Sequence, residues 1–125
     1  VTGANAGIGR EIAAFLAKRG AKVFLVCRDE GRGEAARREI LEEVGAEAGR
    51  LVVLRGDVGL QRDVRQLAER LSAEAPEGLD GLVCNAGALH NERTLTEEGV
   101  EVTFATHFLH GTYLLTELLL PALRA

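Results

Sequence analysis

The feature that most constrains this fold is the alternation of short apolar runs with longer amphipathic segments. The runs at 22–27, 51–54 and 81–84 read KVFLVC, LVVL and GLVC, and each has the length of a strand. The segments around them carry apolar residues at helical spacing. Strands and helices that alternate in this way are joined by right-handed crossovers, so the strands pair in parallel. The sequence therefore predicts an α/β fold, a three-layer doubly wound parallel sheet.

Three amphipathic helices are expected around these strands. The first follows the opening turn and ends at 18–20, the second covers 34–44 and is closed by 45–49, and the third is broken at 76–78. Their predicted apolar stripes are Ile8, Ile12, Phe15 and Leu16 in the first, Ala36, Ile40 and Val44 in the second, and Val64, Leu67, Ala68 and Leu71 in the third.

Both ends of the sequence lie inside predicted elements. A turn signal follows the first two residues, and the chain does not begin with methionine. The last residues continue a leucine-rich region of one or two helices, which is expected to be capped by Thr94 or Thr96 and to run up to Pro121. We therefore expect an internal fragment of a longer protein, with a sheet truncated at both ends and one partial domain over 1–125.

Composition and charge exclude several classes of function. With 46% hydrophobic and 27% charged residues, the 125 residues suit one soluble globular domain. No apolar run approaches the ~18 residues that a membrane span needs. The net charge of -4 argues against nucleic-acid binding, and the 4% of aromatic residues argue against base-stacking surfaces. We expect no membrane span in this segment and no nucleic-acid partner.

The two cysteines, Cys27 and Cys84, each end an apolar run. A small buried thiol is the usual interpretation of such a position, and a disulfide between them is disfavoured. Free thiols are typical of a reducing compartment. We therefore predict an intracellular, cytoplasmic location, with any targeting sequence outside this segment.

Ligands of doubly wound sheets bind at the carboxyl ends of the strands, so the loops there are candidate sites. The first loop, at 2–9, reads TGANAGIG and joins a strand end to a helix start. Glycine permits a sharp turn and lets backbone N–H groups approach a pyrophosphate at the helix N-terminus. The other interpretation is a tight turn that binds nothing.

The second loop begins with Arg28 and Asp29, about 20 residues beyond the glycine turn, where a dinucleotide-binding fold reads the adenine ribose. Arg28 can pair with the 2′-phosphate of NADP by a charge-assisted hydrogen bond. In the neighbouring register Asp29 takes the ribose hydroxyls of NAD, and in a third interpretation Arg28 is a solvated cation. The place of Arg28 directly after the strand favours NADP(H) over NAD(H).

Two further loops follow the next two predicted strands. Asp57 can accept a hydrogen bond from an adenine amino group while Val58 packs on the ring, although Asp57 or Asp63 can equally cap the next helix. Residues 85–87 read NAG, whose small residues allow a ligand to approach closely and whose Asn85 amide can bridge backbone groups. A plain turn is the other interpretation of this segment.

These four loops resemble the short-chain dehydrogenase/reductase family and its retinol-dehydrogenase-like branch. The family's TGxxxGIG turn matches 2–9, its acidic residue after the third strand matches Asp57, which follows the run 51–54, and its NAG motif matches 85–87. The resemblance covers the whole chain. It implies a Rossmann fold that binds a dinucleotide, mostly NADP(H) in this branch. It assigns Gly3, Asn5, Gly7, Ile8 and Gly9 to the pyrophosphate and adenosine side, Arg28 to the 2′-phosphate, Asp57 and Val58 to adenine, and Asn85, Ala86 and Gly87 to the ribose.

The helix that follows departs from the family pattern. The family has an Asn there that helps to hold a proton-relay water. Here its position falls on His107 if one residue is inserted before Gly111, or on Phe108 without a gap. His107 can hold a water or move a proton near neutral pH, or it can pack as a core histidine. His107 and His110 lack a third ligand, so no metal site is predicted.

The acid/base pair of the family is not found in this sequence. Hydride transfer in the family uses a Tyr followed four residues later by a Lys, which lowers the pKa of the Tyr. The only tyrosine, Tyr113, is followed at that spacing by Glu117, and both lysines lie far upstream. We therefore expect no catalytic residue in this chain, with the family's Ser, Tyr and Lys beyond Ala125.

The resemblance implies an NADP-dependent oxidoreductase that interconverts an alcohol and a carbonyl in a small-molecule substrate. The alternative is a non-catalytic dinucleotide-binding redox sensor or scaffold, which the replaced Asn favours. A methyltransferase-like domain is disfavoured because it would place an acid where Arg28 stands. Since the family dimerises through helices, the face of 114–120 suits either a homodimer contact or packing on further sheet.

Overall fold

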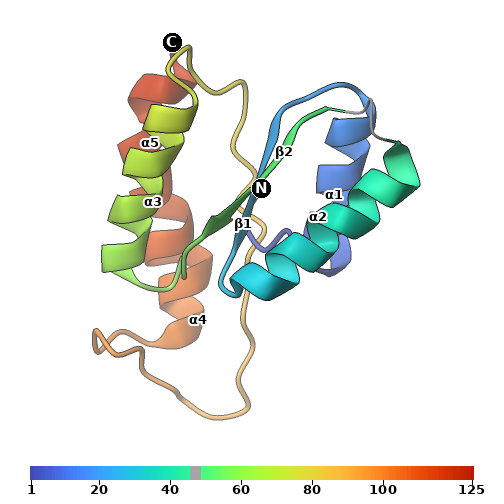
Figure 1. Ribbon diagram of the computed structural model, residues 1–125. Coiled ribbons are helices and arrows are strands. Elements are labelled where there is room, and N and C mark those ends of the chain that lie inside the picture. Colours follow the sequence, from blue (N-terminus) through green and yellow to red (C-terminus); the bar gives the residue numbers. More distant parts are fainter. Residues whose placement is uncertain (46–48) are drawn as a thin grey trace. The chain divides into compact units, whose positions relative to one another are not determined.

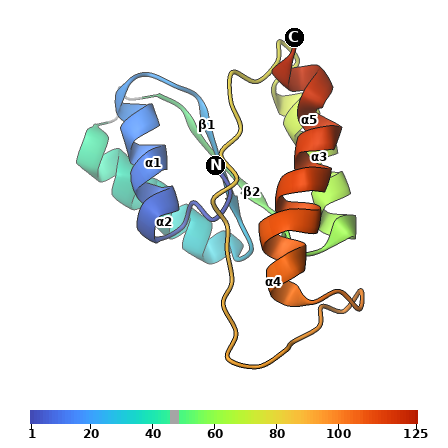
Figure 2. The ribbon, with the colours of Figure 1, turned by 180° about the vertical axis from the view of Figure 1, so that it is seen from behind.

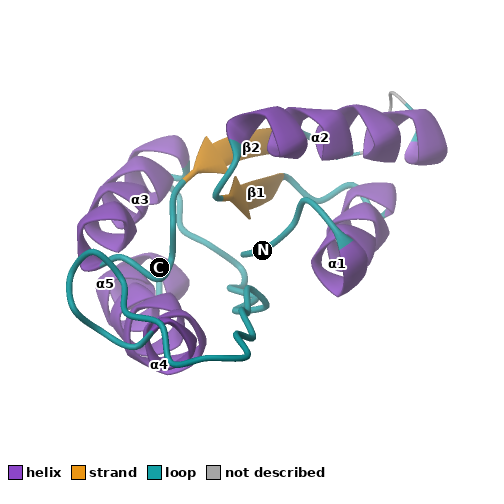
Figure 3. Ribbon diagram, turned by 90° about the horizontal axis from the view of Figure 1, so that it is seen from below, coloured by secondary structure: helices purple, strands orange, loops and turns teal. Residues whose placement is uncertain are grey.

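The chain divides into two compact units, Val1–Arg55 and Gly56–Ala125. The computed structural model describes residues 1–45 and 49–125. Figure 3 shows helices in both units and a pair of strands in the first. Helices combined with a parallel sheet agree with the predicted α/β fold. Among the described helices, none has both the length and the apolar character needed to cross a membrane.

The sheet of the first unit is parallel. β1 (Val23–Cys27) pairs with β2 (Leu51–Arg55), so both strands predicted in this unit are confirmed. Thr2 forms a further parallel bridge to Val26. Val26 also accepts from Gly3 N–H through its carbonyl and donates its own N–H to a carbonyl at the start of the chain. The first residues therefore run along the edge of β1 that β2 leaves open.

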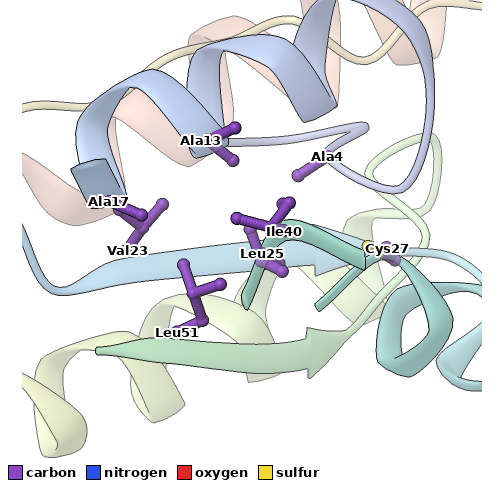
Figure 4. Packing of buried hydrophobic residues seen from close by; sticks show 9 residues of the cluster. Ala4, Ala13, Ala17, Val23, Leu25, Cys27, Ile40 and Leu51 are labelled. Carbon is purple, nitrogen blue, oxygen red and sulfur yellow. The ribbon is translucent and has the colours of Figure 1, made fainter. Parts of the chain in front are cut away.

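Two helices cover one face of this sheet. Because side chains alternate along a strand, Val23, Leu25 and Cys27 point to the same face of β1. They belong to one buried cluster with residues of α1 (Gly7–Lys18) and α2 (Glu30–Val44), as Figure 4 shows. Burying one large aliphatic side chain such as Leu25 contributes about 1.5–3 kcal/mol. The cluster thus fixes both helices and the turns that lead into them.

The predicted apolar stripe of α1 is wrong in part. The residues that α1 buries are small, namely Gly9, Ala13, Ala14 and Ala17. Ile8 and Phe15 are instead 74% and 54% exposed. Small side chains let a helix lie close to a sheet, and this close packing decides which side of the helix faces inward. The Arg19 guanidinium covers the Phe15 ring, 3.5 Å from its centroid.

The start of α2 at Glu30 lies earlier than the predicted 34, because Asp29 caps it. The Asp29 Oδ1 atom accepts a hydrogen bond of 2.9 Å from Arg32 N–H. Ala36 and Ile40 are buried as predicted, and Val44 packs at the edge of the cluster. The predicted closing segment 45–49 lies partly outside the described residues.

In the second unit, α3 (Gln61–Glu74) lies beside α5 (Leu115–Leu123), as Figure 1 shows. The predicted stripe of α3 is confirmed, since the residues it buries are Val64, Leu67, Ala68 and Leu71. The interpretation of Asp57 or Asp63 as its N-cap is wrong, because the N-cap is Leu60. A carboxylate from a distant loop, that of Glu98, accepts from the N–H groups of Gln61 (2.6 Å) and Arg62 (3.2 Å) instead.

Residues 81–84, predicted as a strand, adopt no regular structure. They belong to the irregular segment that leads from α3 to α4 (Val102–Phe104), the yellow to orange trace in Figure 2. An apolar run becomes a strand only where a neighbouring strand completes its hydrogen-bond ladder. Among the described residues the sheet consists of β1 and β2 alone. Cys84 is exposed, which corrects the prediction that it is buried.

The helical region at the C-terminal end begins later than predicted. Neither Thr94 nor Thr96 caps it; the cap is Glu101, whose carboxylate accepts from Thr103 N–H (3.0 Å) and Phe104 N–H (2.7 Å). These hydrogen bonds favour the ionised form and lower the pKa of Glu101. The predicted caps lie in the preceding loop, several residues short of the helix.

Three helical parts follow this cap without a break. These are α4, the π-helix η1 (Ala105–Leu114) and α5. The expected end at Pro121 is wrong, because α5 continues to Leu123. Proline has the φ of a helix but lacks the N–H donor, and its ring crowds the carbonyl four residues back, so Pro121 weakens the last turns of α5 without ending the helix.

Candidate functional site

The glycine-rich turn is held by backbone hydrogen bonds at the carboxyl end of β1. Gly3 N–H and Ala4 N–H both approach the Val26 carbonyl, at 2.9 and 3.4 Å. Gly3 and Gly7 have φ values of 65° and 53°, in the left-handed region that favours glycine. These two positions need glycine for the chain to leave the sheet edge and enter α1.

Among the described residues, no N-cap side chain bonds to the N-terminus of α1. Its N-cap, Ala6, makes no side-chain capping bond, and its first turn contains no acidic residue. The first N–H groups of the helix therefore keep their partial positive charge for an anion. A pyrophosphate is an anion of the kind that such a helix N-terminus binds, so the residues of this turn fit a dinucleotide. Of the neighbouring predicted residues, Gly9 is buried, Asn5 is half-buried and Ile8 is exposed.

Arg28 and Asp29 follow β1 at this same end of the sheet. Arg28 is exposed. The Asp29 carboxylate is already engaged as the N-cap of α2, with Oδ1 2.9 Å from Arg32 N. Asp29 thus serves as a helix cap, while the side chain of Arg28 is exposed at the same end of β1.

Cys27, the last residue of β1, lies beneath these two residues in the core. Burial raises the pKa of its thiol, because the thiolate would lose its hydration. A Cβ atom at Gly33 would lie 3.3 Å from the Cys27 Sγ atom, so α2 packs directly on the thiol. Cys27 is therefore a core residue, as predicted, and its sulfur supports the turn that carries Arg28.

The loop that carries Asp57 and Val58 lies in the second unit. Asp57 Oδ1 accepts from Gly59 N–H at 2.8 Å, and Asp57 N–H donates to Asp63 Oδ2 at 2.9 Å. Val58 is buried, and its Cγ2 atom would be 3.3 Å from a Cβ atom at Gly111. The side chain of Val58 thus packs within this unit, while the half-buried Asp57 supplies the polar group.

The loop of Asn85, Ala86 and Gly87 is held by His107. Ala88 N–H donates to His107 Nε2 at 2.9 Å, while Ala88 O accepts from Thr103 Oγ1 at 3.2 Å. A Cβ atom at Gly87 would lie only 2.9 Å from His107 Nε2 and Cε1, so the ring requires glycine there. Asn85 and Ala86 are half-buried, and Gly87 is exposed.

The π-helix η1 places His107 and Phe108, the two candidates for the family's Asn position, in different surroundings. Phe108 is exposed and lies between Phe104 and Tyr113, with ring centroids 5.7 and 6.5 Å away. His107, by contrast, contacts the loop that the family resemblance assigns to the ribose. A π-turn accommodates one additional residue, as the alignment with an insertion before Gly111 requires.

The whole sequence, residues 1–125, matches the short chain dehydrogenase family. The chain belongs to the short-chain dehydrogenase/reductase family. Dehydrogenase/reductase SDR family member 12 from Bos taurus is 44% identical over 123 residues, which are 98% of this chain and 37% of that protein. Retinol dehydrogenase 14 from Mus musculus is 42% identical over 133 residues, 100% of this chain and 39% of that protein.

A solved structure supports the same fold for this member of the family. A metagenomic short-chain oxidoreductase in complex with NADP is 30% identical, with a TM-score of 0.79 over 98% of this chain and 54% of that chain. The predicted Rossmann fold and the retinol-dehydrogenase-like branch are thus confirmed. The chain spans roughly two fifths of the length of the two curated relatives, as the shares of 37% and 39% show.

The site residues predicted for this chain fall into two groups. The structure brings the glycine turn and Arg28 to the same end of β1. Within the second unit, the loops of Asp57 and of Gly87 both contact η1. Their assignment to individual parts of a dinucleotide stays a prediction.

Sequence reasoning missed two residues that shape these loops. Glu98 caps α3 from a loop far along the chain, and His110 donates from η1 to the Gly59 carbonyl at 2.9 Å. Nothing in the sequence distinguishes Glu98 from the other acidic residues of its loop. For His110, the possible insertion before Gly111 was the sequence feature that could have indicated an unusual helix.

Proposed function

We propose that this chain binds NADP(H), and that the protein containing it interconverts an alcohol and a carbonyl in a small-molecule substrate. The observation that carries the binding is the glycine turn. Left-handed Gly3 and Gly7 lead into a helix N-terminus that has neither a side-chain cap nor an acid in its first turn. When bound, the nicotinamide cofactor supplies or accepts the hydride.

The proposed preference for NADP(H) over NAD(H) depends on the order of Arg28 and Asp29. Asp29 is engaged in capping α2, and the exposed Arg28 directly precedes it. A guanidinium can form two parallel hydrogen bonds to a 2′-phosphate, whereas a carboxylate would repel it. In this proposal Arg28 binds the 2′-phosphate, Asp57 accepts from the adenine amino group, and the loop 85–87 lines the ribose.

The substitution Arg28→Asp tests the choice of cofactor. We expect the ratio of the NADH to the NADPH dissociation constant to fall at least about tenfold, because a charge-assisted bond is replaced by a repulsion. Isothermal titration calorimetry measures both constants. Arg38→Asp makes the same charge change at an exposed position further along α2 and should leave the ratio within about twofold. An unchanged ratio in Arg28→Asp would exclude this role.

The proposed activity requires an acid/base group, which we place in a Ser and a Tyr-x-x-x-Lys motif beyond Ala125. NADPH consumption by the whole protein, with a series of aldehydes and ketones, is the direct measurement. We expect turnover with at least one carbonyl class and its loss when that Tyr is replaced by Phe.

A non-catalytic redox sensor or scaffold is the second candidate. It is favoured by His107, which holds Ala88 where the family has an Asn that helps to position a water. A whole protein that binds NADPH but reduces no carbonyl, and whose sequence lacks the Tyr-x-x-x-Lys motif, would favour this candidate over the reductase.

We also propose a cytoplasmic location and a homodimer. Among the described residues both cysteines are free thiols, which suits a reducing compartment. The exposed rings of Phe104, Phe108 and Tyr113 lie in the helical region that leads into α5 and suit a helical contact. Light scattering gives the mass in solution, and a fluorescent fusion of the whole protein gives the compartment.

A further inference from the structure

A chain of two hydrogen bonds links a buried histidine to the candidate adenine contact. His110, on η1, is only 5% exposed, and its Nδ1 atom lies 2.9 Å from the Gly59 carbonyl oxygen. The N–H of Gly59 in turn donates to Asp57 Oδ1 at 2.8 Å. Since a carbonyl only accepts, His110 Nδ1 is the donor. Gly59 is thereby held from both sides, by His110 and by Asp57.

The π-helical geometry gives His110 this position. Leu115 N–H bonds to the His110 carbonyl, five residues back, which is the spacing of a π-helix. Within this π-helix His110 is buried, while Phe108 and Tyr113 are exposed. An α-helix of the same sequence would rotate these side chains relative to one another.

The loop and η1 pack closely around Gly59. A Cβ atom at Gly59 would lie 2.8 Å from Thr106 Oγ1, and one at Gly111 would lie 3.3 Å from Val58 Cγ2, so there is little space for a side chain at either position. The His110 bond holds the peptide group that follows Gly59, and the Asp57 bond holds the peptide group that precedes it. His110 therefore helps to fix the backbone of the residue to which the Asp57 carboxylate bonds.

Asp57 is left with one oxygen for a ligand. Oδ1 is used by Gly59 N–H, and no donor among the described residues reaches Oδ2. Asp63 fixes the backbone of Asp57 at the same time, through the 2.9 Å bond to its N–H. A carboxylate held in this way is preorganised for one further donor, such as an exocyclic amino group.

We propose that His110 is a positioning residue that orients Asp57 toward the adenine amino group, and so sets the selectivity for adenine. This inference rests on the proposed dinucleotide-binding function. It requires that the N–H donor of His110, and not merely its bulk, determines how well the protein distinguishes adenine from a base without the amino group.

The experiment compares NADPH with its hypoxanthine analogue, in which a carbonyl replaces the amino group. In the whole protein we expect about tenfold tighter binding of NADPH, since hypoxanthine leaves Asp57 without its donor. His110→Leu should reduce this preference to about twofold or less, because the donor to Gly59 is lost. His110→Asn, whose amide N–H can take the place of Nδ1–H, should retain it.

Two variants serve as references for the calorimetric titrations. Asp57→Ala should abolish the preference, and Phe108→Ala, at an exposed position of the same helix, should leave it unchanged. Should His110→Leu fail to fold by circular dichroism, His110→Met provides a more adaptable apolar replacement. A fall in affinity for both dinucleotides with an unchanged ratio would mean a general structural role and would overturn the proposal.

Failure of the proposed function gives a different result. If the unchanged protein binds neither dinucleotide, dinucleotide binding is excluded and the selectivity role falls with it. The orienting contact can then still be measured without ligand, as a loss of protection of the Gly59 amide from hydrogen exchange in His110→Leu relative to the unchanged protein. If the protein binds both dinucleotides equally, only the adenine role of Asp57 and His110 is overturned.

Discussion

The two units hold their candidate cofactor loops by different means. In Val1–Arg55, the glycine turn is fixed by backbone bonds, since Gly3 and Ala4 both approach the Val26 carbonyl. In Gly56–Ala125, side chains hold the loops: His110 bonds to Gly59, and His107 bonds to Ala88. A turn held by its backbone depends on dihedral angles, whereas a loop held by side chains depends on particular donors and acceptors. Single substitutions should therefore act differently in the two units.

The largest effect is expected where the side-chain-held loops meet the helix that holds them. A Cβ atom at Gly111 would overlap the Thr106 carbonyl oxygen and lie 3.3 Å from Val58 Cγ2. Gly111→Ala should therefore lower the free energy of unfolding by about 3 kcal/mol, because η1 must deform. Urea denaturation measures this value, and the m-value shows whether the native state has loosened.

Gly81→Ala is the matched control for this substitution. Its Cβ atom would meet nothing within 4 Å, and Gly81 has no positive φ. Its effect should stay within about 0.5 kcal/mol. Equal values for the two variants would mean that η1 yields easily, and that it cannot fix the loops packed against it.

The backbone-held turn should respond to conformation rather than to volume. Gly7 has a φ of 53°, and a Cβ atom there would meet nothing within 4 Å. Gly7→Ala should cost about 1–2 kcal/mol from the left-handed backbone alone, and Gly7→Asn should cost less because asparagine tolerates this region. Thermal unfolding of the two variants measures the difference. A larger loss with Asn than with Ala would show that space, and not φ, limits this position.

The parts of the fold that could be predicted from the sequence are those specified by local patterns. The stripe of α3 was correct in every residue because one helical face carries all its apolar groups. β1 was correct because a short apolar run meets a parallel partner. In α1 the larger residues Ile8 and Phe15 suggested the wrong face, since the close approach of Ala13 and Ala17 to the sheet is a property of packing.

Contacts between distant residues could not be predicted. Glu98 accepts from the first N–H groups of α3 and Glu101 caps α4, and both carboxylates lie in a loop where many acidic residues look alike. The run 81–84 has the composition of a strand but lacks a ladder partner among the described residues. A ladder depends on the whole sheet, so the pattern of four residues cannot establish it.

The candidate site shows the same division. The glycine turn was predictable because left-handed φ values at Gly3 and Gly7 are a local requirement that glycine meets. The choice between His107 and Phe108 was not, because it depends on a single π-helical insertion. Helical periodicity assumes 3.6 residues per turn, so it misplaces side chains wherever a π-turn occurs.

The smallest effect is expected for the hydrogen bond that Ala88 N–H donates to His107 Nε2. His107→Ala should weaken NADPH binding by about three- to tenfold, since Ala88 N–H loses its acceptor. His107→Gln, which carries an acceptor oxygen at a similar reach, should restore most of the affinity. Isothermal titration calorimetry measures these constants. Full affinity in His107→Ala would show that this loop does not need its side-chain anchor.

The position of the His107 ring also predicts a coupling between substitutions at Gly87 and His107. A Cβ atom at Gly87 would lie 2.9 Å from the ring, so Gly87→Ala should displace His107 and break its bond to Ala88. In the His107→Ala background the same methyl group has room. The two substitutions should therefore be less than additive in their effect on NADPH binding, because either one removes the same hydrogen bond. Additive losses would mean that Gly87 is required by the ligand and not by His107, and the second unit would then resemble the first in holding its loop through the backbone.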